Sequence, residues 1–145
     1  MQIPEYVTKQ EVKRVSQELG LRDWSRMKKH SVSDKEAAIV RKAVGGEALQ
    51  VPIDVFRTGL EVELEHGVVY PDSNVTNNHP LLTGKIVVAH LKEMLDYYER
   101  LEVAEIEGDI YKAVQKKDAA KIARYTKKLA LARQKLAAVE AAGLK

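Results

Sequence analysis

Two rows of apolar residues near the C-terminal end constrain the fold more than any other feature. Ile122, Leu129 and Leu136 fall seven residues apart, and a second row, Tyr125, Ala132 and Val139, follows the same interval. Apolar residues at this spacing lie along one stripe of an α-helix, as in coiled-coil heptads. Asp118 is a favoured helix cap, and Gly143 is a common stop. The pattern therefore predicts a helix from about 118 to 143 with one partner-facing stripe.

The segment before this helix is also predicted to be helical. Residues from Leu82 to about Lys116 form one long helix in this interpretation, with an interruption at Gly108 as an alternative. Because Lys116-Lys117 is a short connection, the two helices should form an antiparallel hairpin. The stripe of Ile122, Leu129 and Leu136 then packs on the preceding helix or serves as a self-association seam.

The N-terminal part contains two helix-start signals. Thr8 with Glu11, and Ser33 with Glu36, have the spacing of capping boxes, and Gly20 and Gly45-Gly46 follow as stops. These signals predict helices at about 9–19 and 34–44. The lone tryptophan, Trp24, is expected in the core. We predict a mainly α fold, a compact small helical domain (1–101) carrying a basic C-terminal hairpin (102–145).

One segment is ambiguous between helix and strand. Leu60, Val62 and Leu64 alternate with charged residues, which is typical of a half-buried strand, and Pro52 interrupts the residues before them. We therefore leave open one short extended segment near 51–65.

Composition narrows the class of protein. The chain has 145 residues, which suits one domain with a real core, and it contains no cysteine. Disulfides, thiolate metal sites and a cysteine nucleophile are thereby excluded. No nucleophile elbow, helix-turn-helix or zinc finger is apparent. No signal peptide or membrane span of about 20 apolar residues is expected.

The net charge of +3 conceals a division along the sequence. Residues 112–145 contain ten Lys and Arg against two acids, a net +8, whereas residues 1–111 carry a net −5. Such asymmetry indicates an anionic partner. We predict that Lys116, Lys117, Lys121, Arg124, Lys127 and Lys128 bind it. A protein partner or self-association is expected, and nucleic acid would be bound without sequence preference.

Two clusters of histidine and carboxylate flank a turn-rich segment, residues 70–80. If both are helical, Glu63 lies one turn from His66, and His90 one turn from Glu93. Mixed imidazole and carboxylate ligands suit zinc, iron or manganese, so these four residues are a candidate metal site. The alternative is that the histidines are partly buried and hydrogen-bonded to Glu63, Glu93 or Asp96.

Three strings of residues carry a resemblance to a known family. They are Phe56-Arg57-x-Gly59-x-x-Val62-Glu63-Leu64-Glu65-His66-Gly67, Asn74-Val75-Thr76-Asn77, and Leu82-Thr83-Gly84-Lys85-Ile86-x-x-Ala89-His90-Leu91-x-Glu93 with Asp96-Tyr97-Tyr98-x-Arg100-Leu101. From about Trp24 to Leu101 the chain resembles an uncharacterised phage and bacterial family of unknown function. The resemblance implies a phage setting, in the host cytoplasm or in the virion, and no established activity.

These observations lead to two functional hypotheses. The first is a non-catalytic, phage-associated structural or interaction protein, a virion or assembly component, that uses its basic hairpin to engage an anionic partner or another subunit. The second is a small metal-dependent enzyme with a His/Glu site.

Overall fold

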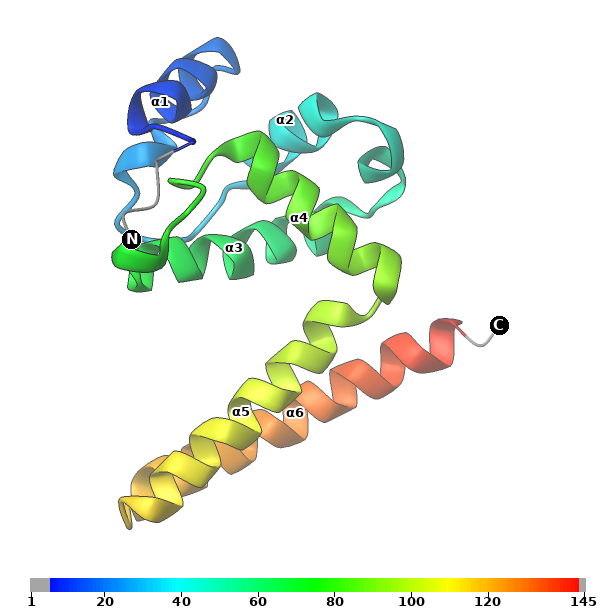
Figure 1. Ribbon diagram of the computed structural model, residues 1–145. Helices are drawn as coiled ribbons and strands as arrows, with labels where there is room; N and C mark the ends of the chain where they lie inside the picture. Colours follow the sequence, from blue (N-terminus) through cyan, green and yellow to red (C-terminus); the bar gives the residue numbers. More distant parts are fainter. Residues whose placement is uncertain (1–5, 144–145) are drawn as a thin grey trace. The chain divides into compact units, whose positions relative to one another are not determined.

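The structure is a computed structural model that describes residues 6–143, and every regular element in that range is helical (Figure 1). The mainly α fold is therefore confirmed. The α-helices are α1 (Lys9–Glu18), α2 (Asp34–Val44), α3 (Ile53–Val69), α4 (Pro80–Glu93), α5 (Tyr97–Gln115) and α6 (Ala119–Gly143). Short 3-10 turns span Trp24–Arg26, Gly46–Gln50 and Pro71–Ser73.

Contacts between residues divide the chain into two units, residues 1–92 and residues 93–145. The second unit contains α5 and α6 and is the C-terminal hairpin. The boundary expected from the sequence, between residues 101 and 102, falls inside α5.

Both helix-start signals in the first unit act as caps. Thr8 Oγ1 accepts a hydrogen bond from the backbone N–H of Glu11 (3.1 Å), while the Glu11 carboxylate binds Arg14 instead of returning to the cap. At the start of α2 the full reciprocal capping box of Ser33 and Glu36 is present. Gly20 follows α1 with a φ of +70°, a conformation that glycine adopts without steric cost.

The extended segment that the sequence left open near 51–65 is not formed, because α3 runs continuously from Ile53 to Val69. Phe56, Leu60 and Leu64 are four residues apart, and all three are buried. Their helical spacing outweighs the short alternation that includes Val62, which is only partly buried. The core of residues 1–92 forms around this face together with Trp24, Val12, Val40 and Val87.

Helix α4 approaches α2 and α3 closely at Gly84. A Cβ atom at this position would lie 3.1 Å from Val40 Cγ1 and 3.3 Å from Phe56 Cζ. Gly84 thus permits helix packing, which gives the glycine of the Leu82-Thr83-Gly84 string a structural role.

The single long helix expected from Leu82 to Lys116 is also wrong, since the chain leaves helical geometry between Glu93 and Tyr97 and not at Gly108. Asp96 is the N-cap residue of α5, and its carboxylate accepts a hydrogen bond from Arg100 Nε (3.0 Å). A short acidic side chain at a helix start complements the helix dipole. The apolar residues Met94 and Leu95 continue the sequence pattern across the break but are exposed.

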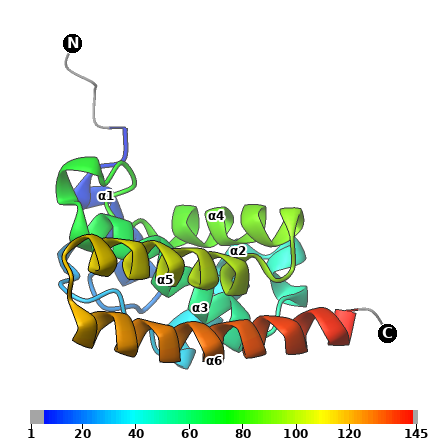
Figure 2. The same cartoon turned by 90° about the horizontal axis from the view of Figure 1, so that it is seen from below.

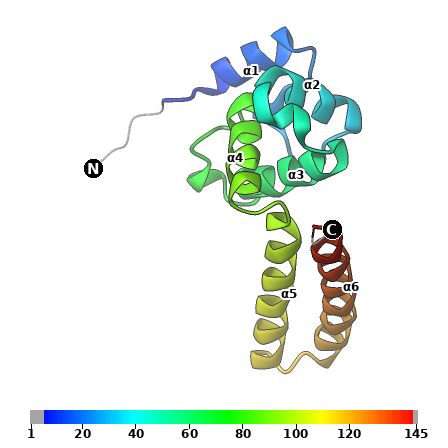
Figure 3. The ribbon, with the colours of Figure 1, turned by 90° about the vertical axis from the view of Figure 1, so that its right-hand side faces the viewer.

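Helices α5 and α6 form the predicted antiparallel hairpin, seen from three sides in Figures 1, 2 and 3. Asp118 caps α6, because its Oδ1 accepts the backbone N–H of Lys121 (3.0 Å). Within α6 the only side chains that are not exposed belong to the two apolar rows: Ile122, Tyr125, Leu129, Ala132, Leu136 and Val139. The stripe is therefore confirmed as the face that packs on α5.

Candidate anion-binding surface

The histidine and carboxylate clusters come together only in part. His90 Nε2 lies 3.4 Å from Glu63 Oε1, across α4 and α3, whereas His66 and Glu93 are exposed. Residues 6–143 contain no group of three or more His, Cys, Asp or Glu side chains that could hold a metal ion. The observed contact is the histidine–carboxylate pair that the sequence left as the alternative, and the metal site stays a prediction.

The turn between α3 and α4 is held by asparagine side chains. Asn74 Nδ2 donates hydrogen bonds to the Gly67 carbonyl (3.2 Å) and to Asn78 Oδ1 (3.0 Å). Asn78 Nδ2 donates to the Trp24 carbonyl, and Asn77 Nδ2 donates to the Val7 carbonyl (2.6 Å). The Asn-rich string of the family resemblance thus has a structural role, because it fastens this turn to α3 and to the N-terminal segment.

His79 caps α4, which sequence reasoning missed. Its Nδ1 accepts hydrogen bonds from the backbone N–H groups of Leu81 (3.2 Å) and Leu82 (3.4 Å), and the side chain is buried. A proline at the first helical position, here Pro80, was the signal that could have placed the helix start. Burial lowers the pKa of His79, partly offset by the nearby Glu11 carboxylate.

This cap predicts acid sensitivity of residues 1–92. In the folded protein the pKa of His79 lies below its ordinary value of 6.5, because burial disfavours the charged imidazole. The neutral His79 side chain therefore makes its full contribution to stability above pH 6.5, and this contribution falls as the pH drops below that value. The slope from one proton is at most about 1.4 kcal/mol per pH unit. We expect His79→Asn, which keeps a cap acceptor, to reduce the slope measured by denaturant unfolding between pH 8 and pH 5. His30→Asn is the matched control, and an unchanged slope in His79→Asn would contradict the assignment.

Ion pairs across the hairpin neutralise charge in the half away from the turn. Arg100 Nη2 lies 2.6 Å from Glu140 Oε1, and Arg133 Nη2 lies 2.6 Å from Glu107 Oε1. Lys135 Nζ lies 3.3 Å from Glu99 Oε1. The acids of α5 therefore compensate the basic residues in the C-terminal half of α6.

The half next to the turn is not compensated in this way. We call residues 112–128 the hairpin tip; they contain seven Lys and Arg and one acid, Asp118. All six predicted anion-binding residues are exposed there: Lys116, Lys117, Lys121, Arg124, Lys127 and Lys128. Asp118 lies 3.5 Å from Lys121 Nζ, and Lys121 is the only one of the six with an ion pair in the described part of the chain.

Tyr125 organises two of these cations. The Arg124 guanidinium carbon lies 4.8 Å from the centre of the Tyr125 ring, and Lys128 Nζ lies 6.0 Å from it. Both contacts are within the range of cation–π attraction. The ring therefore holds positive charge close to the surface of α6.

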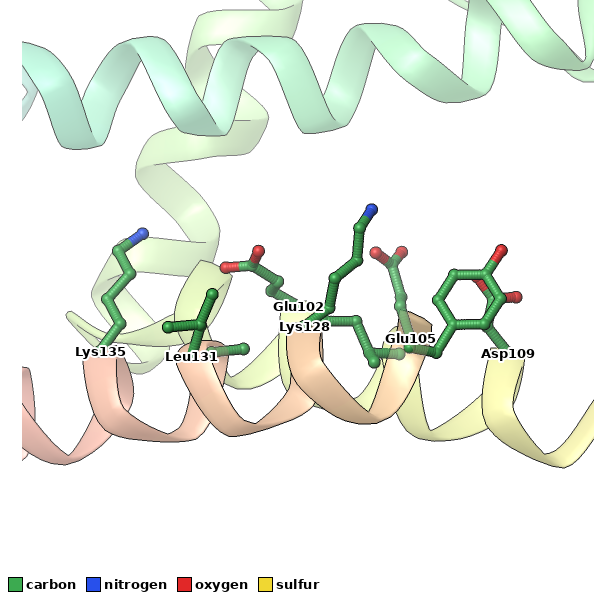
Figure 4. A pocket seen from close by; sticks show the side chains of 9 residues that line it. Glu102, Glu105, Asp109, Lys128, Leu131 and Lys135 are labelled. Atoms are coloured by element: carbon green, nitrogen blue, oxygen red, sulfur yellow. The ribbon is translucent and has the colours of Figure 1, made fainter. Parts of the chain in front are cut away.

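A hollow of about 400 Å³ lies between α5 and α6 beside the tip (Figure 4). Glu102, Glu105 and Asp109 of α5 line it together with Lys128 and Lys135 of α6. Lys128 and Lys135 project to the same side of the hairpin as Glu102 and Glu105. Since both signs of charge line the hollow, it does not favour an anion. Lys116, Lys117, Arg124 and Lys127 are consequently the strongest anion-binding candidates.

Comparison with known proteins places the chain in a family. The model of the family "Protein of unknown function (DUF5661)" matches residues 12–107, and the chain belongs to this family. No curated protein and no solved structure matches the chain. The matched region ends within α5, so α6 and the basic tip lie outside it. No helix in residues 6–143 is both long enough and apolar enough to cross a membrane.

Proposed function

We propose that this protein is a non-catalytic interaction protein whose hairpin tip binds nucleic-acid phosphates without sequence preference. The supporting observation is the uneven neutralisation of charge along the hairpin. Three cross-helix ion pairs offset charge in one half, while the tip keeps a net +6 over residues 112–128. Closely spaced, exposed cations of this kind attract phosphate by displacing its counterions.

Sequence-specific recognition is not part of the proposal. The tip presents long, exposed Lys and Arg side chains on a helical turn, and phosphate contacts made by such side chains carry no sequence information. A phage or virion setting, which the family resemblance implies, fits a protein that contacts nucleic acid or other subunits during assembly.

The test compares two variants with the same change in net charge. One carries Lys116→Gln, Lys117→Gln, Arg124→Gln and Lys127→Gln. The other keeps the tip intact and carries Gln134→Glu, Ala138→Glu, Ala141→Glu and Ala142→Glu, all at exposed positions of α6. Fluorescence anisotropy with two labelled DNA duplexes of unrelated sequence measures the affinity over a range of salt concentrations.

We expect the wild type to bind both duplexes alike, with log K falling against log salt by about 0.9 per phosphate contact. The tip variant should lose binding and most of this salt slope, whereas the control variant should lose far less. Equal losses in the two variants would mean that net charge alone matters. Absence of wild-type binding at low salt would refute the nucleic-acid proposal.

The alternative of a metal-dependent enzyme is tested separately. Elemental analysis of protein purified without chelator, and again after reconstitution with zinc, iron or manganese, would give stoichiometric metal if Glu63, His66, His90 and Glu93 form a site. Release of that metal by His66→Ala and by His90→Ala would assign it to these residues.

A further inference from the structure

One side of the hairpin carries a regular ladder of ion pairs and aliphatic residues. On α5 the residues Arg100, Val103, Glu107 and Ile110 are three or four positions apart, so they share one helix face. On α6 the same holds for Leu129, Arg133, Leu136 and Glu140. The ion pairs Arg100–Glu140 and Glu107–Arg133 join the two rows as rungs, and we call these eight residues the ladder face.

The aliphatic members of the ladder face are only half covered. Val103, Ile110, Leu129 and Leu136 are partly exposed, and the rung side chains remain between 42% and 61% exposed. In α6, by contrast, Ala132 of the other apolar row is buried against α5. Packing on α5 therefore buries Ala132 but leaves part of the surface of Leu129 and Leu136 exposed.

The charges on the ladder face match a second copy of itself. The two rungs have opposite polarity. In Arg100–Glu140 the arginine comes from α5, whereas in Glu107–Arg133 α5 supplies the glutamate. The rungs are two helical turns apart on both helices. A second copy can face the first after a two-fold rotation about an axis that lies in the interface, perpendicular to the helices. Arg100 then lies opposite the partner's Glu107, and in the same register Arg133 lies opposite the partner's Glu140.

We propose that two copies of this chain associate through the ladder face as an antiparallel, two-fold symmetric four-helix bundle. A two-fold interface must be complementary to itself, and this face has two positive and two negative side chains in exchangeable positions. Val103 and Leu136, between the rungs, lie next to the symmetry axis, where aliphatic side chains interdigitate as knobs into holes.

The basic tips determine the orientation. A parallel pair of hairpins would bring two tips of net +6 to the same end, where like charges repel. The antiparallel pair places the tips at opposite ends of the bundle. Both tips then remain accessible, so the proposal is independent of nucleic-acid binding and compatible with it.

The decisive variant exchanges one rung without breaking it. Glu107→Arg with Arg133→Glu keeps the ion pair within the hairpin and the net charge, but gives both rungs the same polarity. The antiparallel copy then places arginine opposite arginine and glutamate opposite glutamate. Asp109→Lys with Lys112→Asp is the matched control, since this pair lies 3.4 Å apart on α5 outside the ladder face.

Light scattering after gel filtration measures the mass of the full chain, which is 16.3 kDa as a monomer. We expect a dimer for the wild type and for the control, and at least about a tenfold weaker dimer for the rung exchange. Circular dichroism melting should show that the exchanged hairpin stays folded. A monomeric wild type, or a dimer indifferent to the exchange, would overturn the proposal.

Cross-linking tests independently which side of the hairpin forms the contact, and the chain suits this experiment because it has no cysteine of its own. A short bis-maleimide should link two copies of Val103→Cys, which lies next to the proposed axis, and should not link Leu131→Cys, which is exposed in the hollow on the other side. Efficient linkage of Leu131→Cys with none of Val103→Cys would place the contact on the wrong side of the hairpin.

Discussion

Replacing Phe56 with alanine should lower the free energy of unfolding of residues 1–92 by about 3 to 5 kcal/mol. Phe56 is fully buried, on the α3 face that also carries Leu60 and Leu64, and its ring meets α4 at Gly84. Removing the ring leaves a cavity at the point where α3 and α4 meet, and the adjacent backbones cannot close it without moving.

The lone tryptophan makes this measurement specific. Trp24 is fully buried in the first unit, so its fluorescence during denaturant unfolding follows residues 1–92 and not the hairpin. Val75→Ala is the control, because Val75 is 83% exposed and should change stability little. A loss below about 1 kcal/mol for Phe56→Ala would contradict the packing of α3 described above.

The second large effect is expected at Gly67. A Cβ atom there would overlap Asn78 Oδ1 and lie 2.6 Å from Asn74 Nδ2. Accommodating it requires the asparagines to leave the hydrogen bonds that hold the turn after α3. Gly67→Ala should therefore destabilise the first unit by about 1 to 3 kcal/mol, although alanine normally favours a helix.

Gly108→Ala provides a control of opposite sign. Gly108 lies inside α5 with no atom near its missing Cβ, so alanine should leave the hairpin unchanged or stabilise it by up to about 1 kcal/mol. Thermal melting followed by circular dichroism measures both variants. Equal behaviour of the two alanines would show that the contacts of Gly67 do not constrain the turn.

Local signals made much of the fold predictable. Ser33 with Glu36, and Asp118, mark helix starts because their side chains bind backbone N–H groups a few residues away. The stripe on α6 was predictable for a similar reason, since periodicity alone defines a helix face. At Leu60 to Leu64 two local patterns compete, so the sequence left helix and strand open. The break before Tyr97 was missed because the apolar residues Met94 and Leu95 continue the pattern without being buried.

The candidate sites were less predictable because they depend on contacts between distant residues. Glu63 and His90 meet across two helices, while His66, one helical turn from Glu63, is exposed. The charge of α6 was evident from composition, but its neutralisation by Glu99 and Glu107 depends on how the hairpin aligns. Only the alignment divides the basic residues into a compensated half and a tip.

The hydrogen bond from Asn77 to the Val7 carbonyl has a consequence for how the chain folds. It joins residues 70 positions apart, so forming it closes a long loop and costs chain entropy before any contact is gained. The contacts of α5 with α6 span much shorter separations around the Lys117 turn. Because folding is faster when contacts are local, the hairpin can form before the first unit makes its long-range contact between Asn77 and Val7. The hairpin with its basic tip is then folded before the helical domain of residues 1–92 is complete.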